Sequence, residues 1–242
     1  MKIGILATSA LNEDLAARFG DLPSMFAKLL SPQDSSLTFE TFAVFQDVFP
    51  STIKACDAWL VTGSPNSAYE RLPWMLVLED FIRQTLAAGI PMVGICFGHQ
   101  IMAQAMGGRV EKEQQGKWGI SVHDYSLSLN GSERPGWMDG DATRFALQAS
   151  HQDQVTALPE GAERIAGNDF CPNGMMLYGK AGLSIQLHPE LPADFISFLI
   201  ENRRGSAMDD ADADAAVIRV ADPVDDQLIA RWIVNFMKSA HA

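Results

Sequence analysis

Short apolar runs alternate with longer amphipathic segments along the first hundred residues. The apolar runs have the length of buried strands, and they comprise Ile3–Leu6, Leu37–Val44, Ala58–Thr62 and Pro91–Ile95. Two intervening segments, Leu15–Leu30 and Trp74–Ala88, have apolar residues at helical spacing. Strands that alternate with helices are joined by right-handed crossovers, so this pattern predicts a parallel sheet with helices on both faces.

Beyond Gly108 the chain becomes turn-rich, and apolar residues alternate with polar ones. Alternation of this kind is typical of antiparallel strands, which we expect at Arg109–Lys112, Gly119–Leu127, Thr143–Ala149 and Glu163–Ala166. These strands are expected to extend one side of the sheet. The predicted fold class is therefore α/β, with a three-layer, doubly wound, mostly parallel sheet and added antiparallel strands.

The C-terminal part is predicted to contain two helices. The first is Pro192–Asn202, and the last should begin with Asp222 as N-cap and Pro223 at its first position. The apolar face of the last helix comprises Ile229, Trp232, Ile233 and Phe236. The Gly205–Asp214 stretch is predicted to be a mobile loop. Because no linker divides the chain, residues 1–242 are expected to form one domain with a helical C-terminal extension from about residue 191.

Composition narrows the classes of partner and compartment. Hydrophobic residues make up 47% of the 242 residues and charged residues 20%, which is typical of a globular domain with a sizeable core. The net charge of −12 argues against a nucleic-acid partner. No apolar run approaches the roughly 20 residues of a membrane span, so no membrane association is expected. Three cysteines and no signal peptide predict a reducing, cytoplasmic setting.

The most informative motif is Gly94-Ile95-Cys96-Phe97-Gly98-His99-Gln100, which joins a predicted strand to a helical segment. A cysteine flanked by glycines at such a junction is typical of a nucleophile on a tight strand-to-helix turn. The turn would place the thiol of Cys96 at the carboxyl edge of the sheet, where α/β folds carry their sites. The helix N-terminus beneath it favours the thiolate.

A second motif, Gln186-Leu187-His188-Pro189-Glu190, follows another apolar run. His188 would lie at a strand end, Pro189 would stop the strand, and Glu190 is near enough to orient the imidazole. A lone histidine at a strand end is most often structural, but its combination with the cysteine turn favours catalysis. Cys96, His188 and Glu190 therefore form a candidate nucleophilic triad.

Other motifs point to no further chemistry. Gly174–Ala181 nearly matches a phosphate-binding loop, but Ala181 replaces the required Ser or Thr and no helix follows. Cys56 is expected to be a packing residue or a modestly exposed thiol, packing is favoured for Cys171, and Asn130-Gly131 is expected to form a turn. Neither histidines nor cysteines are spaced as metal ligands, so no metal and no cofactor are predicted.

The two chemical motifs together resemble the class I glutamine amidotransferase family. Two further stretches agree with this likeness. Gly63-Ser64-Pro65-Asn66-Ser67 resembles the family's oxyanion-hole loop, and Ser150-His151-Gln152-Asp153 resembles the segment that grips the glutamyl head. The likeness runs from Met1 to about Glu190. Within the family, the chain is similar to stand-alone domains like the glutaminase part of GMP synthetase, some of which resemble γ-glutamyl peptidases.

The resemblance implies hydrolysis of a γ-glutamyl amide through a cysteinyl thioester. The backbone amides of Gly63 and Phe97 would hold the oxyanion. Three further residues would recognise the glutamyl head, namely Gln100, Ser150 and His151, the last through its side chain or through its backbone alone. If the leaving group is ammonia, the protein is a glutaminase that serves a synthetase partner subunit. If it is a peptide or amine, the protein is a γ-glutamyl hydrolase that acts alone.

A non-enzymatic role is the alternative. Small proteins of related architecture carry a reactive cysteine on the same turn and act as redox sensors or chaperones. They typically lack a His-Pro-Glu partner so placed, and the presence of His188 with Glu190 here argues against that reading.

Overall fold

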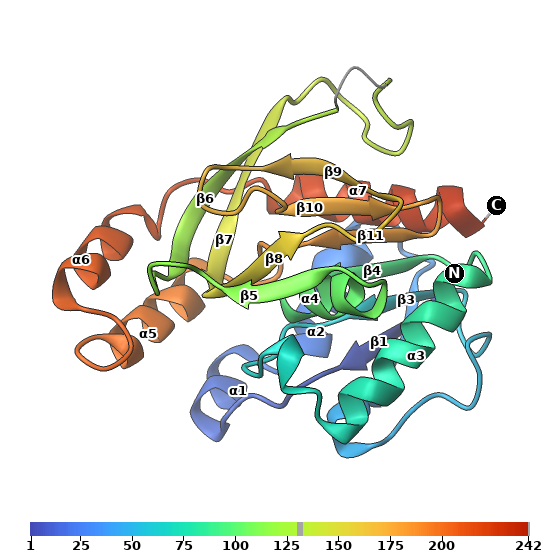
Figure 1. Ribbon diagram of the computed structural model, residues 1–242, viewed down its shortest axis with the longest axis horizontal. Helices are drawn as coiled ribbons and strands as arrows, with labels where there is room; N and C mark the ends of the chain where they lie inside the picture. The colour runs from blue at the N-terminus through green and yellow to red at the C-terminus, as the bar shows by residue number, and fades with distance from the viewer. Residues whose placement is uncertain (130–132, 242) are drawn as a thin grey trace.

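A mixed sheet runs through the middle of the protein and positions its other elements (Figure 1). The computed structural model describes residues 1–129 and 133–241. Within these residues the strands of the main sheet are β1 Lys2–Ala7, β2 Thr38–Ala43, β3 Ala58–Val61, β4 Met92–Ile95, β6 Gly119–Leu127, β7 Arg144–His151, β9 Ala162–Gly167, β10 Met175–Tyr178 and β11 Gly182–Ile185. Their order across the sheet is β2-β1-β3-β4-β11-β10-β9-β6-β7.

The sheet is parallel on one side and antiparallel on the other. Strands β2, β1, β3, β4 and β11 pair in parallel, whereas β10, β9, β6 and β7 add antiparallel pairings beyond β11. This arrangement confirms the predicted fold class. Strands β3, β4 and β11 are buried along their whole length, which explains why they appear in the sequence as continuous apolar runs.

One predicted strand lies outside this sheet. Arg109–Lys112 forms β5, which pairs with β8, Asp153–Ala157, in a separate two-stranded ribbon. The expectation that it extends the main sheet was wrong. Val110 and Val155 of the ribbon pack instead into the apolar cluster that contains Trp74 and Phe97, and burial of this apolar pair favours the ribbon's position.

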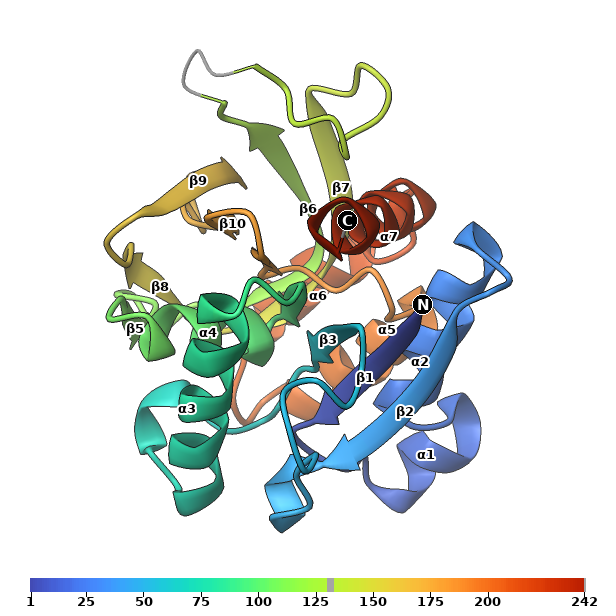
Figure 2. The same cartoon turned by 90° about the vertical axis from the view of Figure 1, so that its right-hand side faces the viewer.

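Helices cover both faces of the sheet. They are α1 Glu13–Phe19, α2 Leu22–Leu30, α3 Pro73–Ala87, α4 Phe97–Ala105, α5 Ala193–Arg203, α6 Asp210–Arg219 and α7 Asp226–His241, with short 3-10 helices at η1 Ser31–Gln33, η2 Val44–Gln46 and η3 Ala68–Glu70. Figure 2 shows α3 and α4 on one face and α2 with α7 on the other. One apolar cluster fills each of these two interfaces, which gives the predicted three layers.

The predicted helix Leu15–Leu30 is two helices. Gly20 ends the first one with φ of 82°, and Asp21 starts the second by accepting a hydrogen bond from the backbone N–H of Ser24 at 2.8 Å. The side chain of Ser24 in turn accepts from the Asp21 N–H, at 3.1 Å. This reciprocal cap, together with a glycine at positive φ, separates the two helices within one apolar stretch.

The C-terminal segment differs from the prediction at the start of its last helix and in the expected loop. The last helix starts at Asp226 and not after Asp222, because Asp225 pairs with Ala146 of β7 through both its N–H and its carboxylate. Its apolar face is buried as expected. Much of the expected Gly205–Asp214 loop belongs to α6, whose N-cap Asp209 accepts a hydrogen bond from the Asp212 N–H at 2.8 Å.

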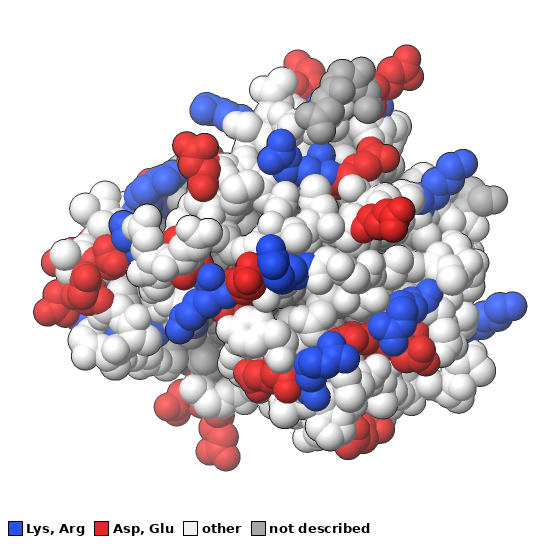
Figure 3. Space-filling view, in the orientation of Figure 1, with Lys and Arg blue, Asp and Glu red and all other residues white. Residues whose placement is uncertain are grey.

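Helices α5 and α6 lie together at one end of the molecule, beside β6 and β7 (Figure 1). Figure 3 shows that acidic side chains gather at this α6 end, whereas both signs of charge are mixed over the rest of that face. No helix in the described part of the chain is long and apolar enough to cross a membrane. The turn predicted at Asn130-Gly131 falls outside the described residues.

Candidate active site

A cavity of about 280 Å³ lies at the carboxyl edge of the parallel strands. The segments that follow β1, β3 and β4 contribute Ser9, Gly63 and Cys96 to its lining, and His188 comes from the segment after β11. Parallel strands bring their carboxyl ends to one edge, so residues far apart in sequence meet there. Of the eight residues predicted for the site, Gly63, Cys96, Ser150 and His188 line this cavity.

Cys96 occupies a strained turn between β4 and α4. Its backbone has φ of 54° and ψ of −105°, a conformation that costs a residue with a Cβ about 1–3 kcal/mol. Its N–H donates to the Ile185 carbonyl of β11 at 2.9 Å, and its carbonyl accepts from the Gln100 N–H at 3.0 Å. These two hydrogen bonds hold the turn between the sheet and the first turn of the helix.

Two glycines allow this turn to form so close to the sheet. A Cβ on Gly94 would lie 2.4 Å from the carbonyl oxygen of Gly98, and a Cβ on Gly98 would lie 2.3 Å from that of Val61. The Gly98 N–H also donates to the Thr62 carbonyl at 3.1 Å. The glycines of the motif are therefore required because the start of α4 touches the backbones of β3 and β4.

His188 and Glu190 form a buried pair beside Cys96. The Nδ1 atom of His188 lies 2.7 Å from Oε1 of Glu190, and the side chain of Glu190 is fully buried. The His188 N–H donates to the Gln148 carbonyl of β7 at 2.8 Å, which anchors the residue between two strands. Burial acts to lower the pKa of His188, but the charges of Glu190 and Cys96 outweigh it and raise that pKa well above its usual value.

Gly63 lies against both His188 and Cys96. A Cβ on Gly63 would stand 3.2 Å from Cε1 of His188 and 3.8 Å from Cβ of Cys96. Its carbonyl accepts hydrogen bonds from the Thr8 hydroxyl at 2.7 Å and from the Ser9 hydroxyl at 3.3 Å. The loop after β3 is thus tied to the end of β1, and its backbone borders Cys96 and His188.

Phe97 is the first residue of α4, so its backbone N–H belongs to the helix N-terminus next to the thiol. Its side chain is buried and packs against Trp74 of α3, with ring centroids 5.7 Å apart. The aromatic contact fixes the start of the helix, which is the part of the chain that sets the direction of the Phe97 amide.

Ser150 lies on β7 and faces the cavity, where its hydroxyl accepts a hydrogen bond from Nη1 of Arg203 at 2.9 Å. Arg203 ends α5 and was not among the predicted site residues. No local motif marks it, since its partner is 53 residues earlier in the chain. The signal that the sequence offers is only its place on the helix that follows His188.

Gln100 and His151 lie outside the cavity lining. The Gln100 amide donates to the Asp153 carbonyl at 2.9 Å and to Oε1 of Gln186 at 3.1 Å. His151 is buried on the opposite face of β7 from Ser150, with its Nδ1 atom 3.1 Å from the Asp153 carbonyl oxygen. Burial lowers the pKa of His151 to about 3, so its ring is neutral near pH 7.

The remaining cysteines and histidines form no second centre in the described part of the chain. Cys171 is fully buried, and burial raises the pKa of its thiol to about 12. Burial also raises the pKa of Cys56, so both thiols stay protonated at neutral pH. Among residues 1–129 and 133–241, no group of three or more His, Cys, Asp or Glu side chains could hold a metal ion.

The model of the family "Glutamine amidotransferase class-I" matches residues 36–194, about two thirds of the chain. This chain belongs to the class I glutamine amidotransferase family. The matched region contains the Cys96 turn, the Gly63 loop and the His188–Glu190 pair. The resemblance seen in the sequence motifs is therefore confirmed at the level of the family.

The chain is similar to several known proteins of this family, two by sequence and one by structure. Gamma-glutamyl peptidase 3 of Arabidopsis thaliana is 26% identical over 83% of this chain and 82% of the plant protein. The glutamine-hydrolysing GMP synthase of an Azoarcus species is 32% identical, but the match covers 54% of this chain and 25% of that enzyme. A crystal structure of a glutamine amidotransferase from Methylobacillus flagellatus shares the fold, with a TM-score of 0.76, 21% identity and coverage of 98% and 94% of the two chains.

Proposed function

We propose that this protein hydrolyses γ-glutamyl amides through a thioester on Cys96. The observation that carries the proposal is the convergence of Cys96, His188 and Gly63 on one cavity, with Glu190 bound to the far side of the imidazole. A nucleophile, a proton carrier and a backbone that borders both are the parts that acyl transfer requires.

In the first half of the reaction, the sulfur of Cys96 attacks the γ-carbonyl carbon and its proton is held by His188. The raised pKa of His188 favours this imidazolium form. The oxyanion that develops would accept hydrogen bonds from the amides of Gly63 and Phe97, each worth about 3–4 kcal/mol in comparable sites. The C–N bond then breaks, and His188 gives its proton to the departing nitrogen.

In the second half, His188 is neutral and takes a proton from water. The resulting hydroxide attacks the thioester carbon, the C–S bond breaks, and the thiolate leaves with glutamate as the product. Glu190, bound to Nδ1, holds the imidazole in the tautomer that presents its other nitrogen to the reacting atoms. Ser150, at the cavity wall, would contact the glutamyl head, whereas Gln100 and the ring of His151 would support the wall from behind.

The cavity wall favours an organic leaving group over ammonia. Beyond the polar edge, the lining is built from apolar side chains of three helices and the segments beside them, namely Leu11, Leu15, Leu22, Leu191, Phe195 and Leu199. The glutamyl head is polar and ammonia offers nothing for this wall to bury. We therefore propose a peptide or amine as the leaving group, which agrees with the near full-length likeness to a γ-glutamyl peptidase.

Glutamate release by the purified chain tests the proposal, with L-glutamine and γ-L-glutamyl-L-leucine compared at equal concentration. We expect the dipeptide to be hydrolysed with a kcat/KM at least about tenfold higher, because its leucine side chain meets the apolar wall. Cys96→Ala should lower turnover by about 10³-fold or more, whereas the control Cys56→Ala, away from the cavity, should retain it.

Two other results would redirect the assignment. Turnover of glutamine alone would indicate a glutaminase that supplies nitrogen to a separate synthetase, as the likeness to GMP synthases would suggest. Full activity in Cys96→Ala would contradict the triad. A wild-type protein that hydrolyses none of the amides, but whose Cys96 thiol is oxidised and reduced reversibly, would favour the redox or chaperone role.

A further inference from the structure

Arg203 is the charged residue of the cavity wall that the reaction described above does not use. Among the described residues that line the cavity, it alone carries a permanent charge. Within residues 1–129 and 133–241, it forms no ion pair with a carboxylate, whereas the next residue, Arg204, pairs with Glu201 at 3.1 Å and with Asp214 at 2.8 Å. In a chain of net charge −12 carboxylates outnumber cations, so an arginine that pairs with none of them is available to bind an anion from outside.

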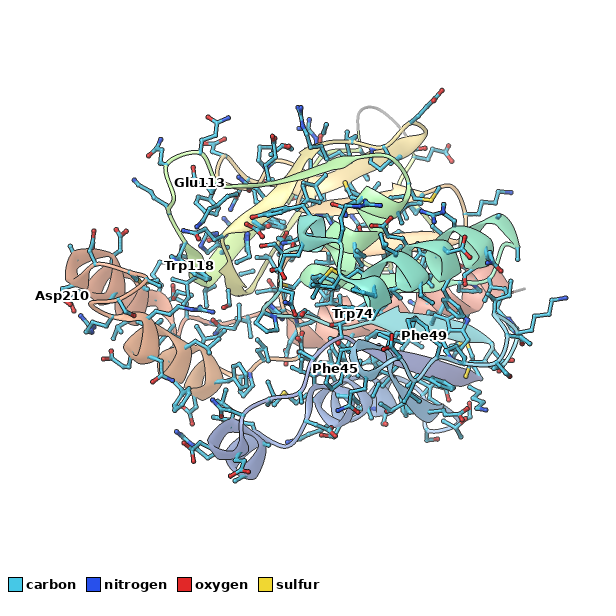
Figure 4. All side chains as sticks on the ribbon, turned by 60° about the horizontal axis from the view of Figure 1, so that its bottom comes forward. Phe45, Phe49, Trp74, Glu113, Trp118 and Asp210 are labelled. Carbon is cyan, nitrogen blue, oxygen red and sulfur yellow. The ribbon has the colours of Figure 1, made fainter. Side chains whose placement is uncertain are left out.

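Two contacts hold the guanidinium of Arg203 at the cavity. Its carbon atom Cζ lies 4.0 Å from the ring centroid of Trp118, a stacking contact, and its Nη1 donates to Ser150 at 2.9 Å. The indole N–H of Trp118 is itself anchored to the Ala207 carbonyl at 3.0 Å. Figure 4 shows Trp118 where the strands meet the C-terminal helices α5 and α6. The side chain is thus preorganised, although both of its partners are uncharged.

This environment makes the charge costly without a ligand. Burial lowers the pKa of Arg203 to about 10, which still leaves the group charged at neutral pH. The charge of Cys96 in the same cavity offsets this burial only in part. A partly desolvated cation without a hydrogen-bonded carboxylate destabilises its surroundings, and a substrate carboxylate in the cavity would remove that cost. A guanidinium presents five N–H donors in a fork that matches a carboxylate, and the bond to Ser150 uses one of them.

We propose that Arg203 binds a carboxylate of the γ-glutamyl substrate, an inference that rests on the proposed function of the cavity. Two carboxylates share this chemistry. One is the α-carboxylate of the glutamyl head, which the position of Ser150 favours, and the other belongs to a leaving amino acid. In either case Arg203 selects substrates by charge, and the apolar wall beside it selects the leaving group.

The test compares Arg203→Gln and Arg203→Lys with Arg204→Gln as the matched control. Three substrates separate the carboxylates: γ-L-glutamyl-p-nitroanilide carries only the α-carboxylate, γ-L-glutamyl-L-leucine carries both, and 4-aminobutyryl-p-nitroanilide carries none. We expect Arg203→Gln to raise KM about 10- to 100-fold for substrates with the bound carboxylate, with kcat changed less than about threefold. The KM of Arg203→Lys should lie between those of the wild type and Arg203→Gln, and the KM of Arg204→Gln should equal that of the wild type.

The pattern across substrates decides the source of the carboxylate. A raised KM for both γ-glutamyl compounds, with no change for 4-aminobutyryl-p-nitroanilide, identifies the α-carboxylate. A raised KM for γ-L-glutamyl-L-leucine alone identifies the carboxylate of the leaving group. An unchanged KM for all three compounds, or an equal rise for the compound without a carboxylate, would overturn the proposal, because the second result is what a purely structural role produces.

A binding measurement separates this proposal from the proposed function. In the Cys96→Ala background, which cannot form the thioester, calorimetry would compare the affinity for γ-L-glutamyl-L-leucine, which carries both carboxylates, with and without Arg203→Gln. A 10- to 100-fold weaker Kd supports the role of Arg203 even if the wild-type chain hydrolyses none of the amides. Equal affinities, or no binding in either protein, would refute it even if the wild-type chain is an active hydrolase.

Discussion

Replacement of Gly98 by alanine tests whether the Cys96 turn depends on the contact between α4 and β3. A Cβ at this position would lie 2.3 Å from the carbonyl oxygen of Val61 and 2.9 Å from the carbonyl carbon. Real Cβ contacts below 3.0 Å are essentially never seen, so the helix start must move by about 0.7 Å. The obstacle is backbone, and a rotamer change cannot relieve it.

Two opposite effects determine the change in stability. Alanine in place of glycine inside a helix stabilises the helix by about 1 kcal/mol. Overpacking against a backbone destabilises a protein by about 1–3 kcal/mol. Because the contact with Val61 is so short, we expect the upper end of that range and a net loss of about 2 kcal/mol. For a chain of 242 residues this corresponds to a Tm lower by about 4–8 °C.

Activity should fall further than stability. Cys96 lies two residues before Gly98, so the displacement is passed to the sulfur, and a misplacement of about 1 Å can cost about 10²-fold in rate. The assay is glutamate release from γ-L-glutamyl-L-leucine well below the Tm of the variant, with Gly136→Ala as control, since a Cβ there meets no atom within 4 Å. Wild-type Tm and activity in Gly98→Ala would refute the steric argument.

Two more predictions concern pH and capping. Because the native pKa of His188 is raised, its protonation stabilises the fold fully below about pH 6.5, and this stabilisation is lost as pH rises through the native pKa. Glu190→Gln removes a charge that raises the pKa of His188, so the free energy of unfolding in urea should vary less with pH between about pH 6 and 9 than in the wild type. The same dependence on pH in both proteins would contradict this. Asp209→Ala should cost about 1 kcal/mol in thermal unfolding through the lost α6 cap, whereas Asp210→Ala should cost less.

The sequence by itself determined the parts of the site that depend on neighbouring residues. The Cys96 turn could be predicted because a glycine-flanked cysteine between an apolar run and a helix has few other physical explanations. The His188–Glu190 pair could be predicted because two residues of separation already bring the carboxylate to the ring. The parallel half of the sheet could also be predicted from local sequence, because fully buried strands appear as continuous apolar runs.

Local competition limited the prediction of helix and strand ends. The apolar pattern continues across Gly20, but a positive φ and the Asp21 cap divide it into two helices. Capping residues also occur near Asp222, yet Asp225 is held by Ala146 of β7, and the helix cannot begin before that contact ends. Propensity is a weak signal that one long-range pair of hydrogen bonds can override.

Only the tertiary structure decided which polar residues face the cavity. Ser150 and His151 are adjacent in sequence but lie on opposite faces of β7, so one lines the cavity and the other is buried behind it. Gln100, one helical turn after Cys96, bonds to Asp153 and Gln186. Arg203 comes to Ser150 because α5 packs against β6 and β7, and no spacing along the chain encodes that contact. Local chemistry marks the candidate nucleophile Cys96, and the packing of distant elements specifies what surrounds it.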